Sequence, residues 1–303
     1  MRTALTIGNF DGVHLGHVQL VAEARRLVDA GGTRGRVVAL AFDPHPLTLL
    51  RPESAPHRLT TFADRTYLLK QAGADEVEQL SPTTQFLSVE PDAFINNLCS
   101  HYKPSFFVEG PDFHFGKAAK GSPATLRVLA DAFGFAAHIV PPVEVPLSDQ
   151  TIVRASSSVV RSMLRLGRVF DAALILGRRY ALRGEVVQGD QRGRTIGFPT
   201  CNLSTDCMLP ADGVYAATAT LPDGTSHPAA INIGTRPTFN GVQRRLEAHL
   251  IGAKLELTYG WELQVVFQTF LRDQVRFDSI DRLKTQLSKD CDRAVGLINR
   301  STA

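Results

Sequence analysis

The sequence predicts two domains of different class: an α/β domain on a parallel sheet, then a small antiparallel β-barrel that ends in an α-helix. Three observations support this prediction. Apolar segments alternate with helical patterns in the first half, turn-linked apolar segments fill most of the second half, and an amphipathic pattern closes the chain. A length of 303 residues is sufficient for two domains of ordinary size.

The first half shows the alternation that is typical of a parallel sheet. Strands are expected at Thr3–Ile7, Arg36–Phe42, Asp75–Leu80, Ser105–Val108 and Ala136–Val140. Between the first two, apolar residues recur at helical spacing, at Leu20, Val21, Ala24, Leu27 and Val28. Such alternation predicts helices on both faces of the sheet. Ligands of these sheets bind beyond the carboxyl ends of the strands, so residues 8–17 are expected at the ligand-binding edge.

The second half changes character near Leu176–Arg179, which predicts domains over residues 1–176 and 177–303. Strands are expected at Leu182–Val187, Gly213–Leu221, Ala229–Ile233, Arg244–Ile251 and Glu262–Phe270. Turn signals separate them at Pro222-Asp223-Gly224 and Asn240-Gly241. No ten-residue helical pattern interrupts these strands, so a small antiparallel barrel is predicted.

The last segment predicts a helix near Ser279–Asn299. Asp278 or Ser279 can cap its start. Its expected buried stripe consists of Ile280, Leu283, Leu287, Cys291, Val295 and Ile298.

The composition of the chain restricts the kinds of partner that we expect it to bind. With 33 basic and 30 acidic residues the charge is too even for nonspecific binding of nucleic acid, which needs a concentrated basic face. The four cysteines form no C-x-x-C pair, and neither a signal peptide nor an apolar membrane span is apparent. We therefore expect a cytoplasmic protein, a monomer or weak homo-oligomer, whose partners are small molecules and not nucleic acid or membrane.

The first candidate site lies in TIGNFDGVHLGH, residues 6–17. Gly8 lets the backbone approach a ligand, and Asn9 and Asp11 are expected to cap the following helix. His14 and His17 are expected to share one face of its first turn, where free N–H groups and the helix dipole favour phosphate. Two imidazoles there could stabilise charge on an α-phosphate under attack, each donor contributing about 3 kcal/mol. The alternatives are a structural histidine pair or a metal site, and no third zinc ligand has suitable spacing.

These residues resemble the H-x-G-H signature of nucleotidyltransferases, and GNFDGVHLGH resembles the FMN adenylyltransferase branch. Two further segments are similar to that branch: FDPHP at Phe42–Pro46 and EGPDFHFGKAAKG at Glu109–Gly121, whose G-x-D/N-F-x-F-G loop borders nucleotide and flavin. Ala155–Arg161 resembles the second phosphate motif, I-S-S-T-x-x-R. On its own this motif would be interpreted as a serine-capped helix.

The resemblance implies a Rossmann-like nucleotidyltransferase domain. It implies three groups of site residues: the catalytic His14, His17 and Arg161; the ATP- and phosphate-binding Gly8, Asn9, Phe10, Asp11, Gly16, Ser156, Ser157 and Ser158; and the FMN-side loop Asp112, Phe113 and His114.

The second candidate site is GDQRGRTIGFPTCN, residues 189–202. It can be interpreted as a flexible flap over phosphates, with Arg192 and Arg194 as cations, or as a basic surface hairpin. Thr200 and Asn202 offer neutral oxygens, which suit Mg²⁺ when substrate phosphates supply the negative charge. Taken singly, Thr and Asn after a proline are more often turn residues.

This string resembles the riboflavin kinase signature G-x-x-R-G-R-x-x-G-F-P-T-A-N, and NIGTRPTFNG and LEAHL are similar to later segments of that family. The resemblance implies a barrel of the riboflavin kinase type with Glu247 as general base and Thr200 and Asn202 as metal ligands. The implied ATP- and flavin-binding residues are Gly189, Arg192, Gly193, Arg194, Thr195, Gly197, Phe198, Pro199, Asn232 and Arg236.

Nearly the whole chain resembles the bifunctional riboflavin kinase/FMN adenylyltransferase family, also called FAD synthetase. The resemblance implies two steps: riboflavin is phosphorylated by ATP with Mg²⁺ in the barrel, and FMN is then adenylylated by a second ATP in the sheet domain, giving FAD and pyrophosphate. Two alternatives remain open. One is a flavin carrier or sensor with degenerate catalysis. The other is a kinase with a weak adenylyl step, because His114, Val159 and Val160 depart from the family pattern.

Overall fold

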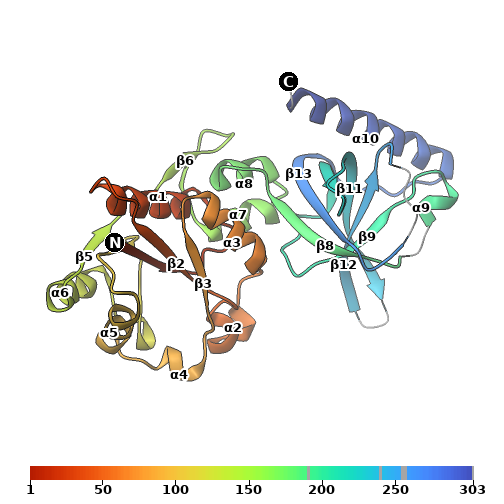
Figure 1. Ribbon diagram of the computed structural model, residues 1–303. Coiled ribbons are helices and arrows are strands. Elements are labelled where there is room, and N and C mark those ends of the chain that lie inside the picture. The colour runs from red at the N-terminus through yellow and green to blue at the C-terminus, as the bar shows by residue number, and fades with distance from the viewer. Residues whose placement is uncertain (190–191, 239–240, 254–257, 302–303) are drawn as a thin grey trace. The chain divides into compact units, whose positions relative to one another are not determined.

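The computed structural model describes residues 1–189, 192–238, 241–253 and 258–301. The side chains of residues 192, 194, 236–238, 241–243 and 300–301 lie outside that description. The chain forms two compact units (Figure 1). One comprises residues 1–56, 60–145 and 152–157, and the other comprises residues 57–59, 146–151 and 158–303. The division at residue 177 stays a prediction.

The first unit is built on a parallel sheet of five strands in the order β3-β2-β1-β4-β5 (Figure 1). All five predicted strands are confirmed within two residues at either end: β1 (Thr3–Gly8), β2 (Arg36–Phe42), β3 (Glu76–Leu80), β4 (Phe106–Glu109) and β5 (Ala136–Ile139).

Helices cover both faces of this sheet. The side chains of β2 alternate between these two buried faces, and β2 is therefore apolar at nearly every position. Val37 and Ala39 pack in one core cluster with Val21 of α1, whereas Val38 and Leu40 pack in a second cluster with residues of α5 and α6. The helices of the unit are α1 (Leu15–Asp29), α2 (Leu47–Leu50), α3 (Phe62–Gln71), α4 (Thr84–Leu87), α5 (Pro91–Tyr102) and α6 (Pro123–Phe133), with short 3₁₀ turns at Pro52–Ser54 and Lys117–Ala119.

Between the sheet and the barrel the chain forms two short paired strands, β6 (Glu144–Pro146) and β7 (Ile152–Arg154), and two helices, α7 (Ser157–Arg165) and α8 (Val169–Leu176). Asp171 of α8 is 3% exposed and accepts hydrogen bonds from Ser148 N (2.7 Å), Ser148 Oγ (3.1 Å) and Arg168 Nε (2.7 Å). These bonds fix the residue 148 loop to α8.

The second unit contains a closed barrel of six antiparallel strands in the order β10-β11-β12-β9-β8-β13. Five were predicted and are confirmed: β8 (Ala181–Val187), β10 (Gly213–Thr220), β11 (Ser226–Thr238), β12 (Gly241–Leu250) and β13 (Glu262–Arg272). The sequence analysis missed β9 (Cys201–Ser204), which pairs with both β12 and β8 and so closes the barrel. Asn240 of the predicted Asn240-Gly241 turn lies outside the described residues.

The terminal helix is α10 (Ile280–Ser301), and Ser279 Oγ accepts a hydrogen bond from Arg282 N (3.3 Å), as predicted for a cap. Its buried stripe begins later than predicted, because Ile280 is 60% exposed whereas Cys291, Ala294 and Ile298 are buried. An ion pair of 2.7 Å between Arg272 of β13 and Asp290 holds this part of the helix on the barrel. Within the described part of the chain, none of the helices combines the length and apolar character that crossing a bilayer demands.

Candidate functional site

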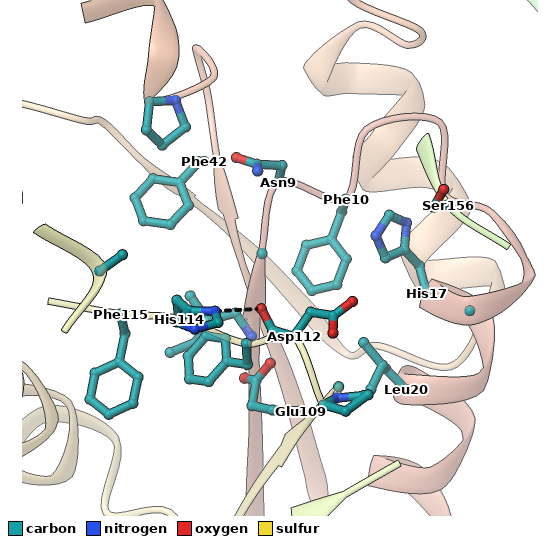
Figure 2. Close-up of a pocket in the computed structure, with 18 of the residues that line it drawn as sticks. Asn9, Phe10, His17, Leu20, Phe42, Glu109, Asp112, His114, Phe115 and Ser156 are labelled. Atoms are coloured by element: carbon teal, nitrogen blue, oxygen red, sulfur yellow. Dashed lines mark hydrogen bonds between the residues drawn. The ribbon is translucent and has the colours of Figure 1, made fainter. Parts of the chain in front are cut away.

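A cavity of about 1010 Å³ opens at the carboxyl ends of the parallel strands (Figure 2). Its walls come from the ends of β1, β2 and β4, the first turns of α1, and the loops that follow β4 and β5. Ligand sites of proteins usually have about 300–1,000 Å³, so this cavity is large enough for two ligands of moderate size.

The cavity lies where the strand order changes direction. From β1 the chain adds β2 and β3 on one side and then β4 and β5 on the other. Open α/β sheets bind ligands in the crevice at such a switch point. The prediction that residues 8–17 lie at this edge is confirmed, because the cavity is lined by Gly8, Asn9, Phe10, His14, Gly16 and His17.

The turn between β1 and α1 has an unusual backbone. Phe10 and Val13 adopt φ of 47° and 41°, a region that residues with a Cβ rarely occupy. Both side chains are 1% exposed, so packing in the core holds this conformation. Thr60 anchors the turn from outside: its N–H donates to Asp11 Oδ1 (3.1 Å), and its Oγ1 accepts from Gly12 N (3.0 Å).

The predicted capping of this helix by Asn9 and Asp11 is wrong. Helix α1 begins at Leu15 with His14 in extended conformation as the N-cap residue, and the His14 side chain makes no capping hydrogen bond. The Asp11 carboxylate is bound to Thr60 instead. Within the described residues, Asn9 Oδ1 is buried and has no hydrogen-bond partner. Because a buried amide oxygen without a partner is costly, it indicates a place where a ligand donor belongs.

The two histidines lie against each other. Their ring centroids are 3.6 Å apart with planes at 24°, and Phe10 meets the ring of His17 edge-on at 5.1 Å. His14 is 7% exposed, so the pair is largely fixed before any ligand binds. Gly16 suits this packing, since a Cβ there would make a tight contact of 3.1 Å with the His14 ring.

The residues of the second phosphate motif fall into two groups, one in each compact unit. Ser156 lines the cavity, and Ser157 Oγ donates to Asp11 O (2.7 Å), which connects the start of α7 to the turn after β1. Ser158 and Arg161 belong to the second unit. There Ser158 O accepts from Ser162 Oγ (3.1 Å), and Arg161 Nε donates to His57 O (2.8 Å).

The predicted FMN-side loop follows β4 and forms another wall (Figure 2). Asp112 forms an ion pair of 2.5 Å with Arg154 of β7, and its carbonyl oxygen lies 2.9 Å from His114 Nδ1. Phe113 stacks on Phe115 with ring centroids 5.2 Å apart. The loop therefore offers an aromatic surface beside a charged rim, which suits a planar, phosphorylated ligand.

The sequence analysis assigned no role to Glu109, the last residue of β4. The carboxyl group is 1% exposed and lines the cavity. Burial raises its pKa well above the usual range, against a smaller opposing effect of the hydrogen bond from Ile7 N. A signal was available: a carboxylate directly after the apolar segment Phe106–Val108 is rarely buried without a function.

In the barrel, three predicted kinase residues lie in one row across neighbouring strands. Glu247 of β12 is directly opposite Asn202 of β9 and Asn232 of β11. Directly opposite residues in antiparallel strands lie close together on one face of the sheet. Gln274 Nε2 donates to Asn232 Oδ1 (2.7 Å) and orients that amide.

Two glycines of the second candidate segment, Gly189 and Gly193, have no room for a side chain. A Cβ at Gly189 would lie 1.9 Å from Asn202 Nδ2, and one at Gly193 would lie 2.2 Å from Phe198 O. His249, which the sequence analysis missed, lies with Nδ1 2.7 Å from Pro199 O and so positions the residues before Thr200. Thr195 is exposed in the short helix α9 (Arg192–Thr195), and Gly197 has a φ of 87°. The side chains of Arg192, Arg194 and Arg236 lie outside the described part of the structure.

The structure also bears on a metal ion in the barrel. Among the described residues there is no group of three or more His, Cys, Asp or Glu side chains that could hold one. Asn202 Oδ1 is buried and has no hydrogen-bond partner among them. A neutral, unsatisfied oxygen fits Mg²⁺ that arrives with substrate phosphates. Burial raises the pKa of the neighbouring Cys201 thiol to about 11, so this cysteine stays protonated and is a poor metal ligand.

Two family models match the chain: FAD synthetase over residues 1–155 and riboflavin kinase over residues 176–298. Three curated proteins with the name bifunctional riboflavin kinase/FMN adenylyltransferase are similar over most of their length. The protein from Escherichia coli (strain K12) is 36% identical over 94% of this chain and 90% of its own. The protein from Haemophilus influenzae is 35% identical over 98% of this chain and 94% of its own. The protein from Bacillus subtilis is 31% identical over 97% of this chain and 92% of its own.

One solved structure is also similar over most of the chain. The crystal structure of a protein described as a macrolide-efflux protein from Streptococcus pneumoniae is 30% identical. The superposition covers 95% of this chain and 92% of the Streptococcus pneumoniae chain, with a TM-score of 0.85.

Proposed function

The chain belongs to the bifunctional riboflavin kinase/FMN adenylyltransferase family, and from that premise we propose which residues carry out each of its two reactions. The cavity of the parallel-sheet unit is the site where FMN is adenylylated by ATP. The row of Asn202, Glu247 and Asn232 in the barrel is the site where riboflavin is phosphorylated by ATP.

The observation that carries the first assignment is the stacked pair of His14 and His17 at the mouth of α1, beside the switch point of the sheet. In the reaction, an oxygen of the FMN phosphate attacks the α-phosphorus of ATP, and the bond to the pyrophosphate breaks. Negative charge on the α-phosphate oxygens grows during this step. Imidazole N–H donors and the backbone N–H groups at the start of α1 stabilise that charge without rearranging.

The remaining cavity residues orient the two substrates. Asn9 Oδ1 accepts a hydrogen bond from a ligand, Gly8 allows close approach, and Ser156 offers a hydroxyl to phosphate. The aromatic loop of Phe113 packs against a planar ring. Arg161, Ser157 and Ser158 are assigned to the phosphate groups by their motif, and pyrophosphate departure is the step in which an arginine there would act.

In the barrel, Glu247 accepts the proton of the ribityl 5′-hydroxyl as that oxygen attacks the γ-phosphorus of ATP. Thr200 and Asn202 are the residues that would hold Mg²⁺. When bound, the ion neutralises phosphate charge. The tight packing of Gly189 on Asn202 holds the amide in place. The resemblance to the kinase signature assigns the glycine-rich segment to the phosphates.

We further propose that the protein acts in the cytoplasm on free small molecules, as a monomer or weak homo-oligomer and without nucleic acid. What supports this is the balanced charge of the chain and its four cysteines, all of which are free thiols. Light scattering on the purified chain, with and without riboflavin and ATP, tests the oligomeric state.

The direct test of the proposed function is chromatography of the flavins formed from riboflavin, ATP and Mg²⁺. FMN is expected first and FAD after it, with one ATP consumed per step. Flavin that stays bound without turnover would contradict the proposal and indicate a carrier.

A further inference from the structure

Glu109 ends β4 inside the cavity of the parallel-sheet unit (Figure 2). Its side chain makes one hydrogen bond within the described residues, accepting from Ile7 N at 2.7 Å through Oε1. The residue is 1% exposed and lines the cavity, and within the described residues the second carboxyl oxygen accepts no hydrogen bond. A carboxyl oxygen of a cavity-lining residue that the protein leaves without a partner is available to a ligand group.

The position of this carboxyl group follows from the way β1 and β4 separate. Their paired residues end at Leu5 and Phe107, three residues before the end of β1 and two residues before the end of β4. Beyond that point, Ile7 N–H donates to the Glu109 side chain instead of to a backbone carbonyl. The Glu109 side chain thus lies between the separating ends of β1 and β4, at the switch point of the sheet. It is held by its own strand, β4, and by the hydrogen bond from Ile7 of β1.

Within the described residues, no cation is paired with the Glu109 carboxyl group. The titratable residues on the cavity walls are His14, His17, Arg51, Asp112, His114 and Arg154. On neighbouring β5 and α1, His138 is paired with Glu23 at 2.9 Å. The raised pKa of Glu109 results from burial, opposed only by the Ile7 hydrogen bond, and none of these groups contributes to it. Burial in this cavity therefore favours the neutral carboxylic acid form of Glu109 over the carboxylate.

A neutral carboxylic acid presents an O–H donor and a carbonyl acceptor side by side. The matching partner is an uncharged heteroaromatic edge with an N–H next to an acceptor. Adenine has such an edge in its exocyclic amino group and the adjacent ring nitrogen. The isoalloxazine ring has one in N3–H and the adjacent carbonyl oxygen.

We propose that Glu109 is a specificity-determining residue of the adenylyl site that binds this ring edge through two hydrogen bonds, donating one and accepting the other. The inference rests on the proposed function of the cavity. It also accounts for burying a carboxyl group where an apolar residue would satisfy the fold.

Two substitutions test the proposal. Glu109→Gln keeps a donor beside an acceptor and should retain most of the affinity for the ring. Glu109→Leu removes both and should raise KM for one substrate by roughly ten- to a hundredfold, with a smaller change in kcat. Glu144→Leu, an exposed carboxylate of β6 outside the cavity, is the matched control and should leave KM unchanged.

The pH profile separates this role from simple packing. In the wild-type protein, KM for the ring that Glu109 binds should rise at alkaline pH as the carboxyl group ionises. In Glu109→Gln that rise should disappear, because the amide does not titrate. A Glu109→Gln variant as impaired as Glu109→Leu would overturn the proposal, since an ionised carboxylate would then be the functional form.

Substrate analogues decide which ring is bound. Purine riboside triphosphate lacks the amino group of adenine, and N3-methyl-FMN lacks the flavin N–H. The wild-type protein should bind one of these analogues much more weakly than the natural substrate. Glu109→Leu should bind that analogue and the natural substrate with nearly equal affinity. If neither analogue distinguishes the two proteins in this way, the proposal is wrong.

Direct binding keeps the inference separate from the proposed reaction. Calorimetry with ATP and fluorescence quenching with FMN need no turnover, and circular dichroism verifies that each variant folds. A wild-type protein that binds both ligands but makes no FAD would contradict the proposed function alone. An equal loss of affinity for ATP and for FMN in a folded Glu109→Leu variant would contradict the role of Glu109.

Discussion

The imidazole rings of His14 and His17 stack with their centroids 3.6 Å apart, one ring from the N-cap residue of α1 and the other from its first turn. Stacking fixes both side chains next to the free backbone N–H groups of the helix. Such a fixed array of donors is what a reaction that builds charge on a phosphate requires. We therefore propose that the adenylyl step depends on this pair and that the kinase step in the barrel does not.

His14→Asn should stop the reaction at FMN. Asparagine keeps a polar residue suited to the N-cap position but removes the imidazole donor, and loss of one such donor costs roughly 100- to 1,000-fold in kcat. Conversion of added FMN to FAD, followed by chromatography, is the measurement. His101→Asn, on the exposed surface of α5, should leave this rate unchanged. Normal FAD production by His14→Asn would remove His14 from the site.

Glu247→Gln should block FMN formation, because the amide cannot accept the proton of the attacking hydroxyl. The loss expected for a general base is roughly 100- to 10,000-fold. Added FMN should still be converted to FAD at the wild-type rate. Glu262→Gln on β13, whose carboxylate is 60% exposed and paired with Arg183, is the control and should retain the kinase step. Kinase activity in Glu247→Gln would exclude it as the base.

Gly189→Ala should impair the kinase step through Asn202. Its Cβ would lie 1.9 Å from Asn202 Nδ2, so the amide must move out of the row with Glu247. Displacements of about 1 Å in a site can cost on the order of 100-fold in rate. Gly296→Ala, in open space on α10, is the matched control; it should keep both activities and stabilise the helix by about 1 kcal/mol or less. Equal effects of the two substitutions on FMN formation would contradict this explanation.

Asp171→Asn should destabilise the protein at neutral pH by about 1–3 kcal/mol. Burial acts to raise the pKa of Asp171, but hydrogen bonds from Ser148 and Arg168 outweigh it and hold the pKa below its usual range. A lowered pKa stabilises the fold at neutral pH, and this contribution is lost as the pH falls below about 4 toward the lowered pKa.

Urea denaturation across pH 3–7 tests this prediction. The difference between wild type and Asp171→Asn should shrink toward the acid end. Asp149→Asn, which removes a more exposed partner of Arg168, should give a much smaller difference. A gap that stays constant with pH would show that the charge of Asp171 is not what stabilises the loop.

The parallel sheet could be predicted from the sequence because its central strands are buried on both faces. The bounds predicted for β2 equal those observed, Arg36–Phe42, since nearly every residue there is apolar. Strand β9 was missed for the opposite reason. It has only four residues, and Asn202 and Ser204 alternate with the buried Cys201 and Leu203, so that little distinguishes it from a loop.

Side-chain partners were harder to predict than strands. Asn9 and Asp11 have the residue types and spacing of helix caps, yet Asp11 is bound to Thr60, which is 49 residues away in the sequence. The pairing of Ile7 with Glu109 joins residues 102 apart and depends on the register of β1 and β4. Motifs gave the positions of the catalytic candidates, whereas these long-range contacts required the fold.

The central claim is that two separate sites act in sequence, and mixing two defective variants tests it most directly. His14→Asn alone should convert riboflavin and ATP to FMN, and Glu247→Gln alone should leave riboflavin unchanged. An equimolar mixture of the two should produce FAD, because FMN released by the first protein is adenylylated by the second. A mixture that makes FMN but no FAD, while Glu247→Gln alone still converts added FMN, would show that FMN does not pass between independent sites. A mixture in which neither variant makes its expected product would contradict the assignment of the residues themselves.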